Sequence, residues 1–189
     1  MTEKILPFKT AADFRKWLAK NFAGSEGIWL RLFKKDSGVP SLNYAQALDE
    51  ALCYGWIDAQ KKSFDDQSWI QRFCPRRAQS KWSKINRDHV ERLIKAKKMR
   101  APGLAAVRAA KADGRWDAAY DSPSNSSLPK ELEAALKKNK KAREFFATLN
   151  RANVYAITYR IQTAKKIETR QRWVERIIKM LEQKKKFHE

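Results

Sequence analysis

The sequence predicts an α+β fold, in which a small N-terminal mixed or antiparallel sheet with covering helices precedes an all-helical C-terminal region. Strand-like alternation of apolar residues occurs only before Pro75. After Pro75 the apolar residues recur at helical spacing. The segment YDSPSNSSLPK, residues 120–130, has no apolar periodicity and is typical of a linker. We therefore expect an α+β domain at residues 1–120, a linker at 121–130 and a helical domain at 131–189.

The first two helices are marked at both ends by residues that favour helix termini. Thr10 and Asp13 form a capping-box pattern at the start of the first helix, and Gly24 is placed to end it. Asn43 is placed to cap the second helix, which Gly55 would end. The apolar side chains at helical spacing are Phe14, Trp17, Leu18 and Phe22 in the first helix, and Tyr44, Ala47, Leu48, Ala51 and Leu52 in the second.

Three segments of the N-terminal half show the two-residue period of strands. In GIWLRLFKK, Ile28, Leu30 and Leu32 fall on one face, which predicts a strand with one buried side. WIDAQKK and SWIQRFC predict two short strands joined by a turn at Asp65 and Asp66. The expected order of elements is therefore helix, strand, helix, strand, strand.

Helices dominate the chain after Pro75. Ser80 or Ser83 is placed to cap a helix that carries Val90, Leu93 and Ile94 inward. Pro102 opens a further, alanine-rich helix and Gly114 ends it. Beyond the linker we expect helices at 129–138, 140–149 and 152–183, the last with one apolar stripe of Val154, Ile157, Ile161, Ala164, Ile167, Val174, Ile178 and Leu181.

The charge of the chain is high and uneven. It has 41 Lys and Arg against 21 Asp and Glu, a net charge of +20. Residues 1–75 carry 11 basic and 9 acidic side chains, and residues 76–189 carry 30 and 12. A net charge of +18 on the second part predicts an anionic partner, nucleic acid or another polyanion. The alternative is that the lysines serve solubility alone.

Composition also excludes several classes of protein. No stretch has the 18 or more apolar residues of a membrane span. The start, MTEKILPFKT, lacks the apolar core of a secretory signal. Two cysteines in 189 residues do not make a disulfide framework, and they favour a reducing compartment. We therefore expect a cytoplasmic protein.

No pattern of residues predicts catalysis, a metal site or a cofactor. Cys53 lies close in sequence to Asp58, but the two histidines, His89 and His188, are not spaced to act as its base. Cys53, Cys74 and His89 lack the local pairs that zinc sites use. The six glycines are scattered, so no phosphate-binding glycine loop is present. We therefore expect a protein without catalytic residues, metal or cofactor.

The segment CPRRAQSKWSKIN gathers hydrogen-bond donors where a helix begins. Helix N-termini favour anions, and arginine forks match phosphate or carboxylate oxygens. One interpretation is therefore a phosphate or carboxylate site. The other is a structural corner in which Trp82 is buried, the serines are caps and Arg77 pairs with Asp58. The candidate anion ligands of this segment are Arg76, Arg77, Ser80, Ser83 and Asn86.

A pocket beside this segment is the alternative to a polyanion-binding protein. Trp56 and Asp58 would lie on the same face of the strand in WIDAQKK. Together with Arg76 and Arg77 they could line a site for a small ligand or an enzyme substrate.

The C-terminal helical region offers a second basic surface. Its five candidates are Lys166, Arg170, Arg172, Arg176 and Lys179, of which the last three share one helical face. Such a face could follow a nucleic-acid backbone or an anionic lipid surface. The interleaved Glu168, Glu175 and Glu182 favour the alternative of an ordinary solvated helix.

Four segments resemble the YdeI/OmpD-associated family, also called the bacteriocin-protection family. They are ALDEALCYGWIDAQ, RFCPRRAQSKWSKIN, MRAPGLAAVRAAKADGRW and AKKIETRQRWVERIIKML, and the resemblance extends from about Trp29 to Leu181. It implies a compact helical C-terminal domain and a link to antimicrobial stress and an outer-membrane porin. It brings no agreed catalytic residues. Members are often described as periplasmic, from which the expected cytoplasmic location departs. We expect a non-enzymatic member of this family that binds an anionic partner.

Overall fold

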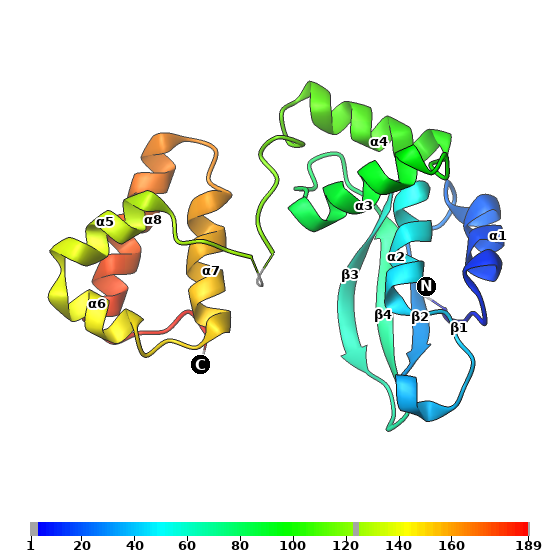
Figure 1. Cartoon of the computed structure of the whole chain (residues 1–189), viewed down its shortest axis with the longest axis horizontal. Coiled ribbons are helices and arrows are strands. Elements are labelled where there is room, and N and C mark those ends of the chain that lie inside the picture. Colours follow the sequence, from blue (N-terminus) through cyan, green and yellow to red (C-terminus); the bar gives the residue numbers. More distant parts are fainter. Residues whose placement is uncertain (1–3, 123–124, 189) are drawn as a thin grey trace. The chain divides into compact units, whose positions relative to one another are not determined.

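A computed structural model describes residues 4–122 and 125–188 of the chain. Residues 1–3, 123–124 and 189 lie outside the described residues, and with them part of the predicted linker. The chain packs into two compact units (Figure 1). The first comprises Met1–Lys81 and Asn86–Asp117, and the second Trp82–Ile85 and Ala118–Glu189. The predicted α+β class, with its sheet at the N-terminus and helices beyond, is confirmed.

The first unit contains a mixed sheet of four strands, in the order β1-β2-β4-β3. The strands are β1 (Ile5–Pro7), β2 (Ile28–Phe33), β3 (Trp56–Ser63) and β4 (Ser68–Pro75). β1 runs parallel to β2, and the other neighbours are antiparallel. The predicted order of elements was wrong at its start, because it lacked β1. This strand has three residues and pairs only through β2, so it shows no alternation of its own.

The first two helices begin at their predicted caps. The Asp13 amide donates to Thr10 Oγ1 (3.2 Å) before α1 (Ala11–Asn21). Asn43 caps α2 (Tyr44–Cys53) in a complete capping box with Gln46. A short 3₁₀ helix, η1 (Lys35–Ser37), precedes α2. The helix α1 ends at Asn21, and Gly24, the predicted terminator, lies in the turn that follows, where its amide donates to the Asn21 carbonyl (3.2 Å).

Both helices cover one face of the sheet and bury aromatic side chains against it. The ring centroids of Phe14 and Phe73 are 5.9 Å apart, and those of Trp17 and Trp56 are 5.8 Å apart. The buried side of β2 consists of Ile28, Leu30 and Leu32, as the alternation predicted.

Two further helices follow the sheet, α3 (Lys84–Lys95), which belongs to the first unit from Asn86 onward, and α4 (Ala101–Ala112), which lies wholly within that unit. The end of α2 approaches α4 closely, since the Arg100 amide donates to the Cys53 carbonyl (3.0 Å). A Cβ added at Gly103 would lie 2.3 Å from the same carbonyl oxygen, so only glycine fits this position. Gly55 has a φ of 74° where α2 gives way to β3, a left-handed conformation that also favours glycine.

The second unit is helical, as predicted. Its helices are α5 (Lys130–Lys138), α6 (Lys140–Phe146), α7 (Arg151–Gln162) and α8 (Ile167–Glu182). This unit also includes the start of α3, where the Lys84 amide donates to the Tyr120 carbonyl (2.9 Å) beside a β-bridge between Ser83 and Tyr120. No helix of the described chain has the length and hydrophobicity that a membrane crossing requires.

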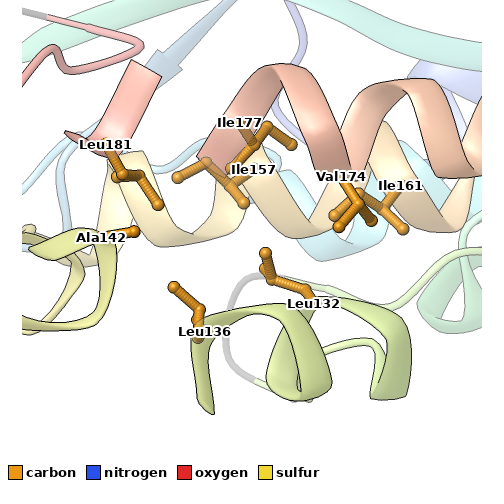
Figure 2. Packing of buried hydrophobic residues seen from close by; sticks show 8 residues of the cluster. All are labelled: Leu132, Leu136, Ala142, Ile157, Ile161, Val174, Ile177 and Leu181. Carbon is orange, nitrogen blue, oxygen red and sulfur yellow. The ribbon is translucent and has the colours of Figure 1, made fainter. Parts of the chain in front are cut away.

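The single helix predicted over 152–183 was wrong. The chain leaves the helical path after Gln162, and Thr163 Oγ1 donates to the Tyr159 carbonyl at this end (2.7 Å). α8 then turns back along α7 (Figure 1). The hairpin lets the apolar faces of both helices bury one another, which a straight helix cannot do. Figure 2 shows the resulting core, formed by Leu132, Leu136, Ala142, Ile157, Ile161, Val174, Ile177 and Leu181.

The break also changes which side chains face inward along α8. Ile177 is fully buried, whereas Ile178, predicted inward, is only partly buried. Ile167, also predicted inward, is 69% exposed. The predicted stripe assumed one continuous helical phase, and the four residues between the helices reset that phase.

Candidate anion-binding surface

Trp56 and Asp58 lie on one face of β3, as their spacing predicted, but each has a structural partner. Trp56 is 1% exposed, and its indole N–H donates to the Phe22 carbonyl (3.1 Å). Asp58 accepts from the Tyr44 hydroxyl (2.9 Å). Burial, together with the Asp58 charge, raises the pKa of Tyr44 above its usual range. These contacts hold β3 to α1 and α2.

The segment after β4 forms a turn that is held mainly by backbone groups. The Ser80 amide donates to the Arg77 carbonyl (2.9 Å), and Arg76 Nη1 donates to the Lys81 carbonyl (2.9 Å). The Ser80 carbonyl in turn accepts from Arg115 Nη1 (3.0 Å). Within residues 4–122 and 125–188, no ion pair joins Arg77 to Asp58. Arg76, Arg77 and Ser80 are thus brought together in one corner of the fold.

The remaining candidates of this segment lie at the start of α3. The helix begins at Lys84, directly after Ser83, and Asn86 lies in its first turn. Ser83 is also the residue that bridges to Tyr120. Trp82 is 2% exposed and therefore a core residue, which agrees with the interpretation of this segment as a structural corner.

A polar cluster that sequence reasoning missed connects α2 with α3. His89 Nδ1 lies 2.6 Å from Asp49 Oδ1, and Arg92 Nη2 donates to both Asp49 oxygens at 2.7 Å. His89 and Arg92 are three residues apart and so share a helix face. Their partner lies 40 residues earlier, which no local pattern reveals. The cluster attaches α3 to α2.

Cys53 has the environment of a structural thiol. It is 3% exposed, and burial raises its pKa to about 11. A thiolate is the nucleophilic form of cysteine, so this environment opposes the use of Cys53 as a nucleophile. Among the described residues, no group of three or more His, Cys, Asp or Glu side chains could hold a metal ion.

The predicted basic face of α8 contains an open hollow of about 240 Å³. Its lining residues are Thr169, Arg172, Trp173 and Arg176. The Arg176 guanidinium carbon lies 5.4 Å from the Trp173 ring centroid. From the neighbouring helix α7, the Arg160 guanidinium carbon lies 5.0 Å from the same centroid. We call Arg160, Arg172, Trp173 and Arg176 the basic–aromatic surface.

The other three candidates of the predicted basic surface are placed differently. Arg170 turns toward α5, where its Nη1 lies 3.3 Å from a carboxylate oxygen of Glu131. Lys166 directly precedes α8, and Lys179 lies exposed in its last turn. Arg172 and Arg176 therefore line the same hollow, whereas Arg170 forms an ion pair with Glu131.

The three arginines of the basic–aromatic surface have no carboxylate partner within the described chain. The nearest polar contact is from Arg172 Nε to the backbone carbonyl of Glu168, at 3.5 Å. Glu182 accepts from Asn139 instead (2.6 Å). The interleaved glutamates therefore do not neutralise this surface by pairing.

The side chains of the basic–aromatic surface have the chemistry to bind an anion. Guanidinium groups present planar forks of N–H donors that match phosphate and carboxylate oxygens. An indole face can stack on a nucleobase or attract a cation. Sequence reasoning found Arg172 and Arg176 from their spacing. It missed Arg160, because this residue comes from another helix, and it did not single out Trp173.

Comparison with known proteins divides the chain in two. Residues 6–106, more than half of the chain, match a family described as a domain of unknown function (DUF8412). Residues 125–184 match the family described as bacteriocin-protection, YdeI or OmpD-associated. The YdeI match thus lies within the helical unit, whereas two of the four resembling segments fall wholly, and a third partly, in the other match. No curated protein and no solved structure gives a match. The chain therefore belongs to the DUF8412 family through residues 6–106, and its residues 125–184 are similar to the YdeI/OmpD-associated family.

Proposed function

We propose that this protein is a non-enzymatic YdeI/OmpD-associated-like protein that binds nucleic acid through the basic–aromatic surface of its C-terminal domain. The observation that carries the proposal is that Arg160 and Arg176 lie against the Trp173 indole, and Arg172 lines the same hollow as Trp173, without a carboxylate partner for these arginines in the described chain. Three unpaired guanidinium groups at one place repel one another, and a phosphate backbone would relieve that repulsion.

The distribution of charge supports the same proposal. Residues 76–189, which include this surface, carry 30 basic and 12 acidic side chains. A polyanion releases its condensed counterions when such a surface neutralises its phosphates. With about six phosphates neutralised, the slope of log K against log salt would be about −5.

Removing two arginines of the surface is expected to weaken binding and to reduce its salt dependence. For Arg172→Ala/Arg176→Ala we expect at least about tenfold lower affinity for a labelled oligonucleotide, measured by fluorescence anisotropy. The slope against salt should become shallower by about 2, because two phosphate contacts are lost. The matched control is Lys137→Ala/Lys138→Ala, which removes the same charge from exposed positions on α5.

The proposal fails if both double variants lose affinity equally, since net charge alone would then explain binding. It also fails if the wild-type chain gives a flat salt titration. Circular dichroism of each variant shows whether its helices are retained, so that a loss of fold is recognised.

We further propose that this binding protects cells from bacteriocins or related antimicrobial stress, as the description of the matched family suggests. We place the contact in the cytoplasm, which is supported by the two free cysteines. Cells that produce the wild-type chain should survive a bacteriocin better than cells that produce Arg172→Ala/Arg176→Ala at equal abundance. Equal survival of the two strains would contradict the proposed link between anion binding and protection.

A further inference from the structure

The N-terminal sheet has a second face, which α1 and α2 do not cover. The buried residues of β2 face these helices, so the alternate residues Trp29, Arg31 and Phe33 lie on the opposite face, each partly exposed. Two exposed apolar residues extend this face: Ile5 on β1 is 42% exposed and Phe64 beyond β3 is 46% exposed. We call Trp29, Arg31, Phe33 and Phe64, with Lys62 of β3, the outer sheet face, and Ile5 lies beside it on the edge strand.

Planar groups follow one another along this face. In β2 the Cα atoms of Trp29, Arg31 and Phe33 are spaced at about 7 Å, and these side chains follow one another because alternate residues of a strand share a face. The Arg31 guanidinium carbon lies 4.5 Å from the Phe33 centroid and 4.9 Å from the Phe64 centroid.

The guanidinium group of Arg31 is held in a fixed orientation. Its Nε donates to Ser68 Oγ (2.9 Å), and its Nη2 donates to Asp65 (2.7 Å). Ser68 also donates to Asp65, and this hydrogen bond lowers the pKa of the carboxyl group. The plane of Arg31 is thus positioned before any ligand arrives.

A second cation lies on the same face without a fixed partner. Lys62 Nζ is 4.8 Å from the Trp29 ring centroid, and within the described residues the ammonium group forms no ion pair. It is exposed, and its flexible side chain can leave the indole to reach a phosphate.

We propose that the outer sheet face binds single-stranded nucleic acid by stacking its bases on Trp29, Arg31, Phe33 and Phe64. Unpaired bases stack on aromatic rings and on guanidinium planes, and nearby cations contact the backbone between them. This site belongs to the other unit of the chain and depends on none of the residues of the basic–aromatic surface.

The placement of the cations favours this ligand over an apolar partner. Arg31 and Lys62 lie over the rings themselves, in the middle of the face. A protein partner or a second copy that covered the rings would bury the Lys62 ammonium group, which is costly without a matching carboxylate. A phosphate backbone provides the negative charge and leaves the bases free to stack.

The test measures binding of the full-length chain to a labelled oligothymidylate of about 12 nucleotides and to a duplex of equal length. For Trp29→Leu/Phe33→Leu we expect affinity for the single strand to fall at least about tenfold. Duplex affinity and the salt slope should stay unchanged, because paired bases cannot stack on the sheet and no phosphate contact is removed. Leucine keeps these positions apolar, and a thermal unfolding curve verifies the fold.

Two further variants keep the result interpretable. Phe64→Leu lies outside the strands, so it tests stacking without a change in the sheet, and should weaken single-strand binding about threefold or more. Ile5→Ala removes an exposed apolar side chain from the same face without removing a ring, and should leave binding unchanged. Equal losses with Ile5→Ala would indicate an apolar docking surface and overturn the proposal.

The result also separates this proposal from the proposed function of the C-terminal domain. Arg172→Ala/Arg176→Ala should weaken single-strand and duplex binding together, whereas Trp29→Leu/Phe33→Leu should affect the single strand alone. If Trp29→Leu/Phe33→Leu leaves the affinity for the single strand unchanged, the proposal for the outer sheet face is wrong, and the proposal for the basic–aromatic surface is not affected. If only Trp29→Leu/Phe33→Leu loses affinity, the proposal for the basic–aromatic surface is wrong, and the proposal for the outer sheet face is supported.

Discussion

Gly103→Ala is expected to destabilise the N-terminal unit by about 3 kcal/mol or more. The added Cβ would lie 2.3 Å from the Cys53 carbonyl oxygen and 2.7 Å from that of Leu52. Both are backbone atoms of the last turn of α2, so no side-chain rotation can relieve the overlap. Movement of α4 would stretch the hydrogen bond from the Arg100 amide to Cys53. The expected result is a fall in Tm of about 10 °C or more.

Differential scanning calorimetry of Gly24→Ala provides the control for this prediction. A Cβ at Gly24 would meet no atom within 4 Å, and the residue does not adopt the left-handed conformation that requires glycine. We expect its Tm to stay within a few degrees of wild type, about 3 °C at most. If the Tm values of the two variants agree, the close packing of α4 on α2 is wrong.

Local chemistry made the N-terminal unit largely predictable. Thr10 and Asn43 marked helix starts because their side chains satisfy backbone amides that a helix leaves unpaired. The alternation of side chains in β2 predicted which face of the strand is buried, because one side of the sheet packs against helices. β1 was missed because three residues give no period, and its strand conformation comes only from pairing with β2.

The C-terminal hairpin was not predictable from local sequence. Thr163, Ala164 and two lysines separate α7 from α8, and none of these residue types forbids a helix. What decides the break is burial of Ile157 and Ile161 by the opposite helix, a contact between residues far apart in the chain. A residue pattern within one short segment of the sequence does not predict such long-range contacts.

In the candidate site, too, local spacing was predictable from the sequence, whereas contacts between distant segments were not. The spacing of Arg172 and Arg176 placed both on one face of a helix, and the structure places them around one hollow. Arg160 joins them only because the hairpin brings α7 alongside. Trp56 and Asp58 were placed correctly on one strand face, but the sequence did not reveal that the indole N–H and the carboxylate would bind Phe22 and Tyr44.

Two isoleucines of α8 test whether the hairpin is the native arrangement. Ile177 is fully buried and Ile167 is 69% exposed, although one continuous helix would turn Ile167 inward. We expect Ile177→Ala to cost about 3 kcal/mol, because it leaves a cavity in a core of few residues. Ile167→Ala should cost no more than about 0.5 kcal/mol.

Hydrogen exchange measured by mass spectrometry on peptides of α7 and α8 separates the two effects within the full-length chain. A loss of about 3 kcal/mol raises the population of the open state about a hundredfold, so the slowest amides of Ile177→Ala should exchange about a hundredfold faster. The same amides in Ile167→Ala should retain the wild-type rate. The opposite ranking would mean that the apolar stripe continues through residues 163–166 and that α7 and α8 form one helix. In that case Arg160 could not lie beside Trp173, because the two would be separated by about three and a half turns of a straight helix.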